Sequence, residues 1–149
     1  MINGSLPPQI DRVLRYFSGL SREERMQALA SYSRKLEPLP DRFKDLPREA
    51  FSVPECQTPV EIFPEHRDGR MHFYAEVDAR RSPTVAAILA IVFAGVNDQP
   101  PATTLAIPGD LVRQLMDNIG LGAREAGLNA MLMRLKRHAA DAEGQSNGR

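Results

Sequence analysis

The longest apolar stretch of the chain runs from Val85 to Val96, and only Gly95 interrupts it. Ser82-Pro83 stands just before it, and a serine N-cap followed by proline at the first helical position is a common start of a helix. Because apolar side chains cover nearly every face, this helix must be buried on all sides. It is too short to span a bilayer. We therefore predict a core helix over residues 83–94, ended by Gly95, around which the rest of the chain packs.

Two amphipathic helices are predicted before it. The first follows Pro7 and Pro8 and ends at Gly19. The second begins at Ser21, since Glu24 three residues later completes a capping box. Their inner faces contain Ile10, Val13, Leu14 and Phe17 in the first helix and Met26, Leu29 and Ala30 in the second. Two short helices in succession predict a helical hairpin.

A β-hairpin is predicted between this helix pair and the core helix. Residues 71–77 alternate apolar and polar side chains, as a strand with one buried face does. Residues 60–63 form its partner strand, residues 64–70 form the connecting loop, and Asp68-Gly69 is a strong signal for a tight turn. After the core helix, residues 105–107 fit either a short third strand or an extended segment.

Helices complete the C-terminal part. Asp110 can cap a helix over residues 111–116, which Gly120 and Gly122 would end. The last helix is predicted over residues 123–140, and its inner stripe contains Leu128, Met131, Leu132 and Leu135. The polar residues 143–149 are expected to be disordered. Together the elements indicate one α+β domain, which suits a chain of 149 residues.

Charge and cysteine content exclude several classes of function. The 19 basic and 19 acidic side chains balance and are mixed along the chain, so nothing points to nucleic acid or an anionic membrane. Residues 1–5 do not resemble the start of a signal peptide. A single cysteine excludes an internal disulfide framework and agrees with a reducing compartment. We therefore expect a cytoplasmic protein that binds neither nucleic acid nor membrane.

The single cysteine, Cys56, lies between Pro54 and Pro59. Proline disfavours the interior of helices and sheets, so residues 52–60 should form a stiff loop that enters the first strand. A thiol on a rigid loop can be reactive, but a lone cysteine in a reduced protein is more often a small buried hydrophobe. The residues alone leave both interpretations open.

One thiol also limits the chemistry that is available. Iron–sulfur scaffolds and structural zinc sites need several ligands, and a two-cysteine redox cycle needs a second thiol. The histidines at 66, 72 and 138 show no ligand-like spacing with the cysteine, so no metal site is expected. We interpret His66 and His72 as surface residues, since no pattern places either beside the thiol as a catalytic base.

The loop resembles the active-site loop of the SufE-like sulfur-acceptor proteins, which reads Val-x-x-Cys-Gln-(Ser or Thr)-x-Val. The matching residues here are Val53, Cys56, Gln57, Thr58 and Val60. A second motif of that family, Arg-x-x-Gly-Leu-x-x-Met, is matched by Arg124, Gly127, Leu128 and Met131. Order and spacing agree from about Leu6 to Ala140.

The chain departs from the family pattern in three places. Glu55 stands where many members carry glycine, and Glu61 stands where a large apolar residue often follows the valine. Arg80-Arg81 stands where members carry acidic residues. Because Glu55 puts a negative charge beside the thiol, it should raise the pKa of Cys56.

The resemblance implies a SufE/IscU-like two-layer α+β fold. Its small antiparallel sheet, residues 60–63 with 71–77, would pack against the N-terminal helix pair, the core helix and the C-terminal helices. A single SufE-like domain would span residues 6–142, with flexible tails at residues 1–5 and 143–149.

The same resemblance implies a sulfur acceptor. Cys56 would take persulfide sulfur from a SufS-like cysteine desulfurase, activate that enzyme and pass the sulfur to a SufBCD-like iron–sulfur scaffold. Gln57 and Thr58 would support the loop, and Arg124 is a candidate contact for the persulfide or the partner. Pyridoxal phosphate would belong to the desulfurase, so no cofactor is expected here. The protein would be a monomer or a weak homodimer, and its thiol would be poorly accessible when the protein is free.

Alternatives stay open at each level. The chain could be a binding module that regulates the desulfurase without covalent transfer, or an unrelated thiol enzyme such as a one-cysteine peroxidase. Gln57 and Thr58 could serve only the backbone of the loop, and Arg124 could be a solvated arginine at the start of a helix.

Overall fold

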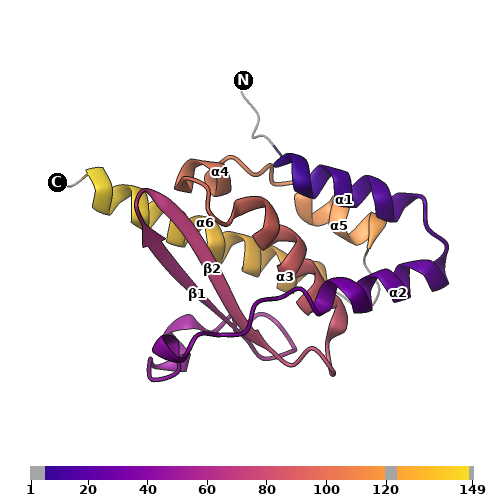
Figure 1. Cartoon of the computed structure of the whole chain (residues 1–149), viewed down its shortest axis with the longest axis horizontal. Helices are drawn as coiled ribbons and strands as arrows, with labels where there is room; N and C mark the ends of the chain where they lie inside the picture. The colour runs from indigo at the N-terminus through magenta and orange to yellow at the C-terminus, as the bar shows by residue number, and fades with distance from the viewer. Residues whose placement is uncertain (1–5, 120–123, 148–149) are drawn as a thin grey trace.

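The computed structural model describes residues 6–119 and 124–147 of the chain. This part contains six α-helices, two β-strands and two short 3-10 turns (Figure 1). In order along the chain they are α1 (Pro8–Ser18), α2 (Arg22–Ser33), η1 (Asp41–Phe43), η2 (Arg48–Phe51), β1 (Val60–Arg67), β2 (Arg70–Val77), α3 (Pro83–Val96), α4 (Pro101–Leu105), α5 (Leu111–Asn118) and α6 (Glu125–Asn147).

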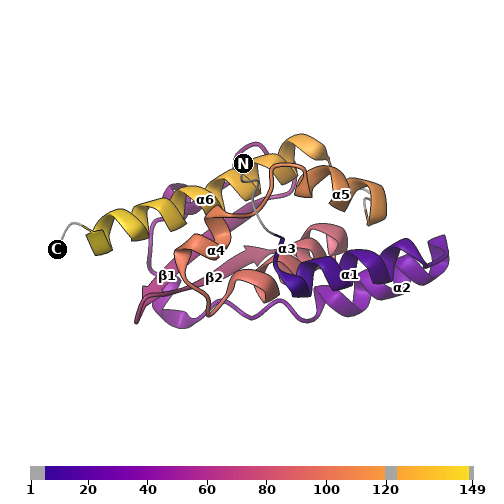
Figure 2. The same ribbon diagram turned by 90° about the horizontal axis from the view of Figure 1, so that it is seen from above.

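Helix α3 is the centre of the molecule, as its apolar composition predicts. It lies between α1 and α2 on one side and α5 and α6 on the other (Figure 2). All side chains from Ala86 to Phe93 are buried, and Phe93 stacks on Phe73 of β2 with 5.9 Å between the ring centroids. Helix α3 therefore joins the helical part of the fold to the hairpin.

Gly95 does not end α3, so that prediction was wrong. The helix continues through Val96, and the backbone N–H of Asn97 still donates to the carbonyl of Phe93 at 2.7 Å. Gly95 instead allows α1 to approach, because a Cβ at this position would lie 2.7 Å from Cγ1 of the fully buried Ile10. The glycine marks a close contact between two helices rather than a helix end.

The hairpin has the predicted turn but a longer first strand. Strands β1 and β2 pair antiparallel from Val60 opposite Val77 to Arg67 opposite Arg70. Asp68 and Gly69 both have positive φ, 55° and 77°, as the two central residues of a type I′ turn require. Residues 64–67 therefore belong to β1 and not to a loop. Proline at position 64 is tolerated because a two-stranded sheet has only edge strands.

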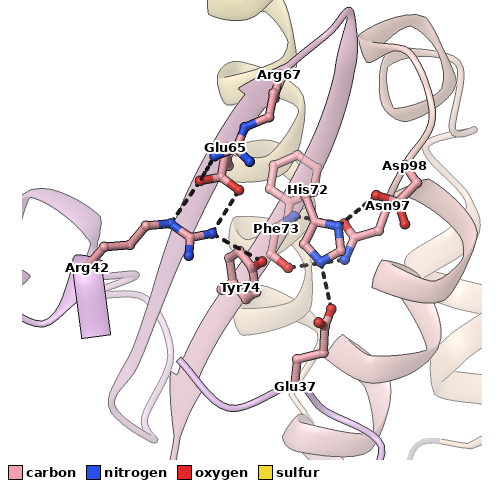
Figure 3. A network of polar contacts seen from close by, with 9 residues as sticks. All are labelled: Glu37, Arg42, Glu65, Arg67, His72, Phe73, Tyr74, Asn97 and Asp98. Carbon is pink, nitrogen blue, oxygen red and sulfur yellow. Dashed lines mark hydrogen bonds and ion pairs between the residues drawn. The ribbon is translucent and has the colours of Figure 1, made fainter. Parts of the chain in front are cut away.

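The outer face of the hairpin is covered by residues 37–51, which we call the strap. Its aromatic rings pack on the sheet, with ring centroids 5.5 Å apart for Phe43 and Phe63 and 4.6 Å apart for Phe51 and Phe63. Its Arg42 donates two hydrogen bonds to the carboxylate of Glu65, at 3.0 and 2.9 Å (Figure 3). The strap thus gives the sheet a second buried face and leads directly into the cysteine loop.

Residues 105–107 do not form a third strand. Pro101 starts the short helix α4, which includes Leu105, and Ile107 follows it as a buried core residue. The free edge of β2 is paired instead by residues 97–99. The side chain of Asn97 accepts from the N–H of Phe73 at 2.7 Å and donates to its carbonyl at 3.2 Å.

The N-terminal helix pair has the predicted capping box, but the buried face of its second helix, α2, differs from the predicted one. The capping box of Ser21 and Glu24 is present. Helix α2 buries Ala28 and Leu29, whereas Met26 is 58% exposed and the predicted Ala30 is also exposed. The buried face of this short helix is therefore narrower than its apolar residues suggest.

The last helix begins near its predicted start and ends later than expected. Helix α6 runs from Glu125 to Asn147, so residues 143–147, predicted as part of a flexible tail, are helical. The predicted inner stripe is confirmed, since Leu128, Met131, Leu132 and Leu135 are all buried. The predicted helix-breaking glycines at 120 and 122 lie outside the described residues, as do residues 1–5.

Candidate functional site

The cysteine loop, residues 52–59, connects η2 to β1 and is closed at its base. The N–H of Val53 donates to the carbonyl of Val60 at 2.9 Å, and the Val53 side chain is only 2% exposed. The N–H of Cys56 then donates to the carbonyl of Val53 at 3.1 Å, which closes a tight turn. These bonds confirm a well-defined loop with Cys56 near its apex, as the two flanking prolines predict.

The thiol points toward the start of α6. Its Sγ lies 3.6 Å from the carbonyl oxygen of Gly127, to which the thiol donates a weak hydrogen bond. A Cβ on Gly127 would lie only 3.2 Å from the same sulfur. The two sequence motifs, about seventy residues apart, therefore meet at one contact that glycine permits.

A small cavity of about 60 Å³ lies beside the thiol. Its wall combines the cysteine loop, the first turn of α3 and the start of α6. The lining residues are Glu55, Cys56, Gln57, Thr58, Val85, Arg124, Gly127, Leu128 and Met131. All four residues that the sequence predicted for the site thus lie around one cavity, and Arg124 and Gln57 keep exposed side chains there.

The thiol is half-buried, and its surroundings disfavour the thiolate. Burial raises the pKa of Cys56 above its ordinary value of 9.0, and the nearby Glu55 carboxylate raises that pKa further. The effect predicted for Glu55 therefore has the right direction but is the smaller of the two causes. At neutral pH the resting protein holds a protonated thiol.

Ser82 also belongs to the site, in a role that its N-cap pattern does not indicate. Its hydroxyl lies 2.5 Å from Oγ1 of Thr58, so it joins the cysteine loop to the start of α3. The sequence predicted only that Ser82 would cap α3. No local pattern could reveal the contact, because the two residues come together only when the hairpin folds.

A wider groove of about 600 Å³ flanks the other side of the loop. Thr58 and Arg81 line this groove. Arg48 also lines it, as do Glu61 and Glu76, the two glutamates that Arg48 binds. The guanidinium of Arg48 lies 3.1 Å from the carboxylate of Glu61 and 3.6 Å from that of Glu76. Glu61, one of the departures from the family loop, is thus part of an ion-pair cluster that ties the strap to the hairpin.

No histidine of the described chain lines the thiol cavity. His72 is held instead between two carboxylates, with Nε2 2.6 Å from Glu37 and Nδ1 3.0 Å from Asp98 (Figure 3). His66 and His138 each have a buried Nε2 without a hydrogen-bond partner. Both side chains are partly exposed, His66 in β1 rather than in a loop and His72 between two carboxylates, and neither can serve Cys56 as a base in this arrangement.

Neither a metal-binding cluster nor a membrane-spanning helix occurs within the described residues. No group of three or more histidine, cysteine, aspartate or glutamate side chains there is placed to hold a metal ion. No helix in this part of the chain is both long and apolar enough to cross a bilayer.

Comparison with known proteins identifies the family. A family model described as "SufE: Fe-S metabolism associated domain" matches residues 11–139 of the chain. The chain belongs to the SufE family. The SufE description associates the family with iron–sulfur metabolism, and the match covers both motifs predicted from the sequence.

Relatives and a solved structure agree with this SufE assignment. Proteins named "uncharacterized SufE-like protein" from two strains of Mycobacterium tuberculosis are each 32% identical over 147 residues, which covers 93% of this chain and 96% of theirs. The solution structure of a hypothetical protein from Thermus thermophilus is 28% identical, with a TM-score of 0.77 over 94% of this chain and 99% of that one. The predicted α+β SufE fold is confirmed.

Proposed function

We propose that this SufE-family protein accepts sulfur on Cys56 from a SufS-like cysteine desulfurase and thereby activates that enzyme. The observation that supports this most directly is the setting of the only cysteine. It lies at the apex of a loop, half-buried against Gly127 and beside Arg124, where the two family motifs meet.

The reaction would be an exchange between a thiolate and a persulfide. The Cys56 thiolate attacks the terminal sulfur of a persulfide on the desulfurase. A new S–S bond forms on Cys56, the S–S bond of the donor breaks, and the donor cysteine leaves as a thiolate. The proton that Cys56 loses goes to the leaving thiolate or to solvent. Atoms and electrons balance, so the step needs no external oxidant or reductant.

The resting protein is poorly prepared for this attack, because the pKa of Cys56 is raised by burial and by Glu55. Docking on the desulfurase would have to lower that pKa, either by moving the thiol away from the apolar wall or by bringing a cation near it. Arg124 lines the same cavity and can offset the negative charge of a persulfide formed there.

The remaining assignments follow from this chemistry. Pyridoxal phosphate belongs to the desulfurase, so this chain needs no cofactor of its own. A persulfide on Cys56 is again open to attack at its terminal sulfur, and a SufBCD-like iron–sulfur scaffold would receive the sulfur by a second exchange. A free thiol of this kind suits the reducing cytoplasm. Gln57 and Thr58 keep the roles predicted for them as support of the loop.

The raised pKa of Cys56 favours a second candidate, a module that binds and activates the desulfurase without covalent transfer. In that function the thiol would be a packing residue against Gly127. The two candidates differ in one requirement, since only sulfur transfer needs the Cys56 sulfur atom.

The deciding experiment is intact-protein mass spectrometry after incubation with a pyridoxal-phosphate cysteine desulfurase and free cysteine. Wild type is compared with Cys56→Ser, and desulfurase turnover is followed in the same samples. We expect wild type alone to gain the mass of sulfur, a reductant to reverse the gain, and Cys56→Ser to lose most of the stimulation.

Stimulation by both proteins without added mass would support the binding module instead. If neither protein gained sulfur or stimulated turnover, both candidates would be wrong for this desulfurase.

A further inference from the structure

Ser82 occupies the N-cap position of α3 but does not cap the helix. Its side chain makes no capping hydrogen bond, and its backbone has φ −139° and ψ 66°. The same protein contains a serine that does cap. Ser21 has an extended backbone with ψ 169°, and its side chain accepts from the N–H of Glu24 at 3.2 Å. Serine at this position normally satisfies one of the N–H groups of the first turn, so Ser82 has given up its usual partner.

The hydroxyl of Ser82 is used on the cysteine loop instead, 2.5 Å from Oγ1 of Thr58. Within the described residues, side-chain hydrogen bonds hold this loop at two points, which are this one and the contact of Cys56 with the Gly127 carbonyl. The second is a thiol contact at 3.6 Å and is intrinsically weak. The hydroxyl pair is therefore the stronger of the two polar attachments.

From these two observations we propose that Ser82 is a two-position switch for the cysteine loop. In the closed position its hydroxyl bonds Thr58 and keeps Cys56 on α6. In the open position the backbone at Ser82 becomes extended, as it is at Ser21, and the hydroxyl accepts from the N–H of Val85 in the first turn of α3 and caps the helix. Opening then exchanges one hydrogen bond for another, so a docking partner can release the thiol at little energetic cost.

The biological purpose of the switch rests on the proposed function, but its test does not, because the test uses the free protein. Ser82 touches neither sulfur nor substrate, so it is a positioning residue that acts through Thr58. Its effect is visible in the free protein as the rate at which a maleimide alkylates Cys56, because only the open loop exposes the thiol fully. The rate is measured without desulfurase and over a range of pH, which separates loop opening from a change in thiol pKa.

Four variants distinguish a switch with two positions for Ser82 from a contact that only holds the loop closed. Thr58→Val removes the closed-state bond and leaves Ser82 able to cap, so we expect alkylation roughly three- to tenfold faster than in wild type. Thr58→Ser keeps the hydroxyl and should restore the wild-type rate. Ser82→Ala loses both partners, so its rate should stay much closer to wild type than that of Thr58→Val. Thr103→Val on the distant helix α4 is the matched control and should change nothing.

Hydrogen exchange at the backbone amide of Val85 gives a second readout. In Thr58→Val the freed serine should protect this amide, whereas in Ser82→Ala the amide should exchange as in wild type, because Ser82 does not cap the helix in the closed position. The proposal is overturned if Thr58→Val alkylates at the wild-type rate, or if Ser82→Ala alkylates as fast as Thr58→Val, which is the result for a contact that only holds the loop closed. Should the expected order of rates appear while wild type takes up no sulfur, the switch stands and the proposed function fails.

Discussion

Gly127 decides, at the scale of single residues, how closely Cys56 can lie against α6. Its carbonyl accepts from the thiol, and its missing side chain leaves room for the sulfur. Cys56 and Gly127 belong to two motifs that lie far apart in the sequence, and neither motif predicts that the two residues are in contact. The contact explains why a glycine stands inside the first turns of a helix, where alanine would favour helix formation by about 1 kcal/mol.

Gly127→Ala should therefore push the thiol outward. The new Cβ would lie 3.2 Å from Sγ, so the cysteine loop must shift. Overpacking of about 1–3 kcal/mol against the closed loop predicts maleimide alkylation of Cys56 that is about tenfold faster. The matched control is Gly144→Ala in the same helix, where a Cβ would meet nothing within 4 Å. Equal alkylation rates in both variants would mean that Gly127 does not hold the thiol in place.

At the scale of elements, the sequence predicts where helices and strands form better than where they end. Caps and periodicity were enough for α1, α2 and the hairpin turn, because those signals act within a few residues. Gly95 does not end α3, although its pattern predicts that it does. A glycine is needed there because Ile10 of α1 packs closely against it. Met26 was misread as inner because α2 buries a narrower face than its apolar residues suggest. Both errors concern contacts that local patterns do not contain.

The imidazole of His72 joins three elements that are distant in sequence. It connects the strap through Glu37, strand β2, and the α3–α4 connection through Asp98. Both ring nitrogens face carboxylate oxygens, and only the imidazolium can donate to both. Burial by itself would lower the pKa of His72, but the hydrogen bonds to Asp98 and Glu37 and their negative charges outweigh it and raise that pKa.

This geometry predicts a loss of stability as pH rises above 6.5. Because the folded-state pKa of His72 is raised, its contribution is present in full below the ordinary value of 6.5 and is lost as pH rises through the raised value. The thermal unfolding temperature of wild type should therefore fall more than that of His72→Gln as pH rises through this range. Glu37→Gln should lower the pKa of His72, measured by its ring resonances in NMR. A ring that titrates at or below 6.5 in wild type would contradict the ion-paired arrangement.

At the scale of the whole molecule, both faces of the hairpin and both sides of α3 are covered. The described residues form a large hydrophobic cluster around α3 and a small one of Leu39, Phe43 and Phe63 between the strap and the hairpin, with few polar groups inside them. His138 is an exception, since its Nε2 is buried in α6 without a hydrogen-bond partner. The sequence could not indicate this, because a histidine near the end of a basic helix also suits a solvated position. Its environment gives the folded protein a second pH dependence, of opposite sign to that of His72.

His138 should destabilise the protein at acid pH. Burial lowers its pKa, Arg134 lowers it further, Asp141 raises it in part, and Arg137 again lowers it. The unfolded chain therefore binds this proton more readily, so the stability present above the ordinary value of 6.5 is lost as pH falls below it. In chemical denaturation between about pH 7.5 and about pH 5, His138→Gln should lose less stability than wild type. The loss of stability toward acid pH should be larger in Asp141→Asn, because this change removes the carboxylate that favours the imidazolium of His138. If wild type and His138→Gln lost the same stability toward acid pH, that loss would come from carboxylates and not from His138.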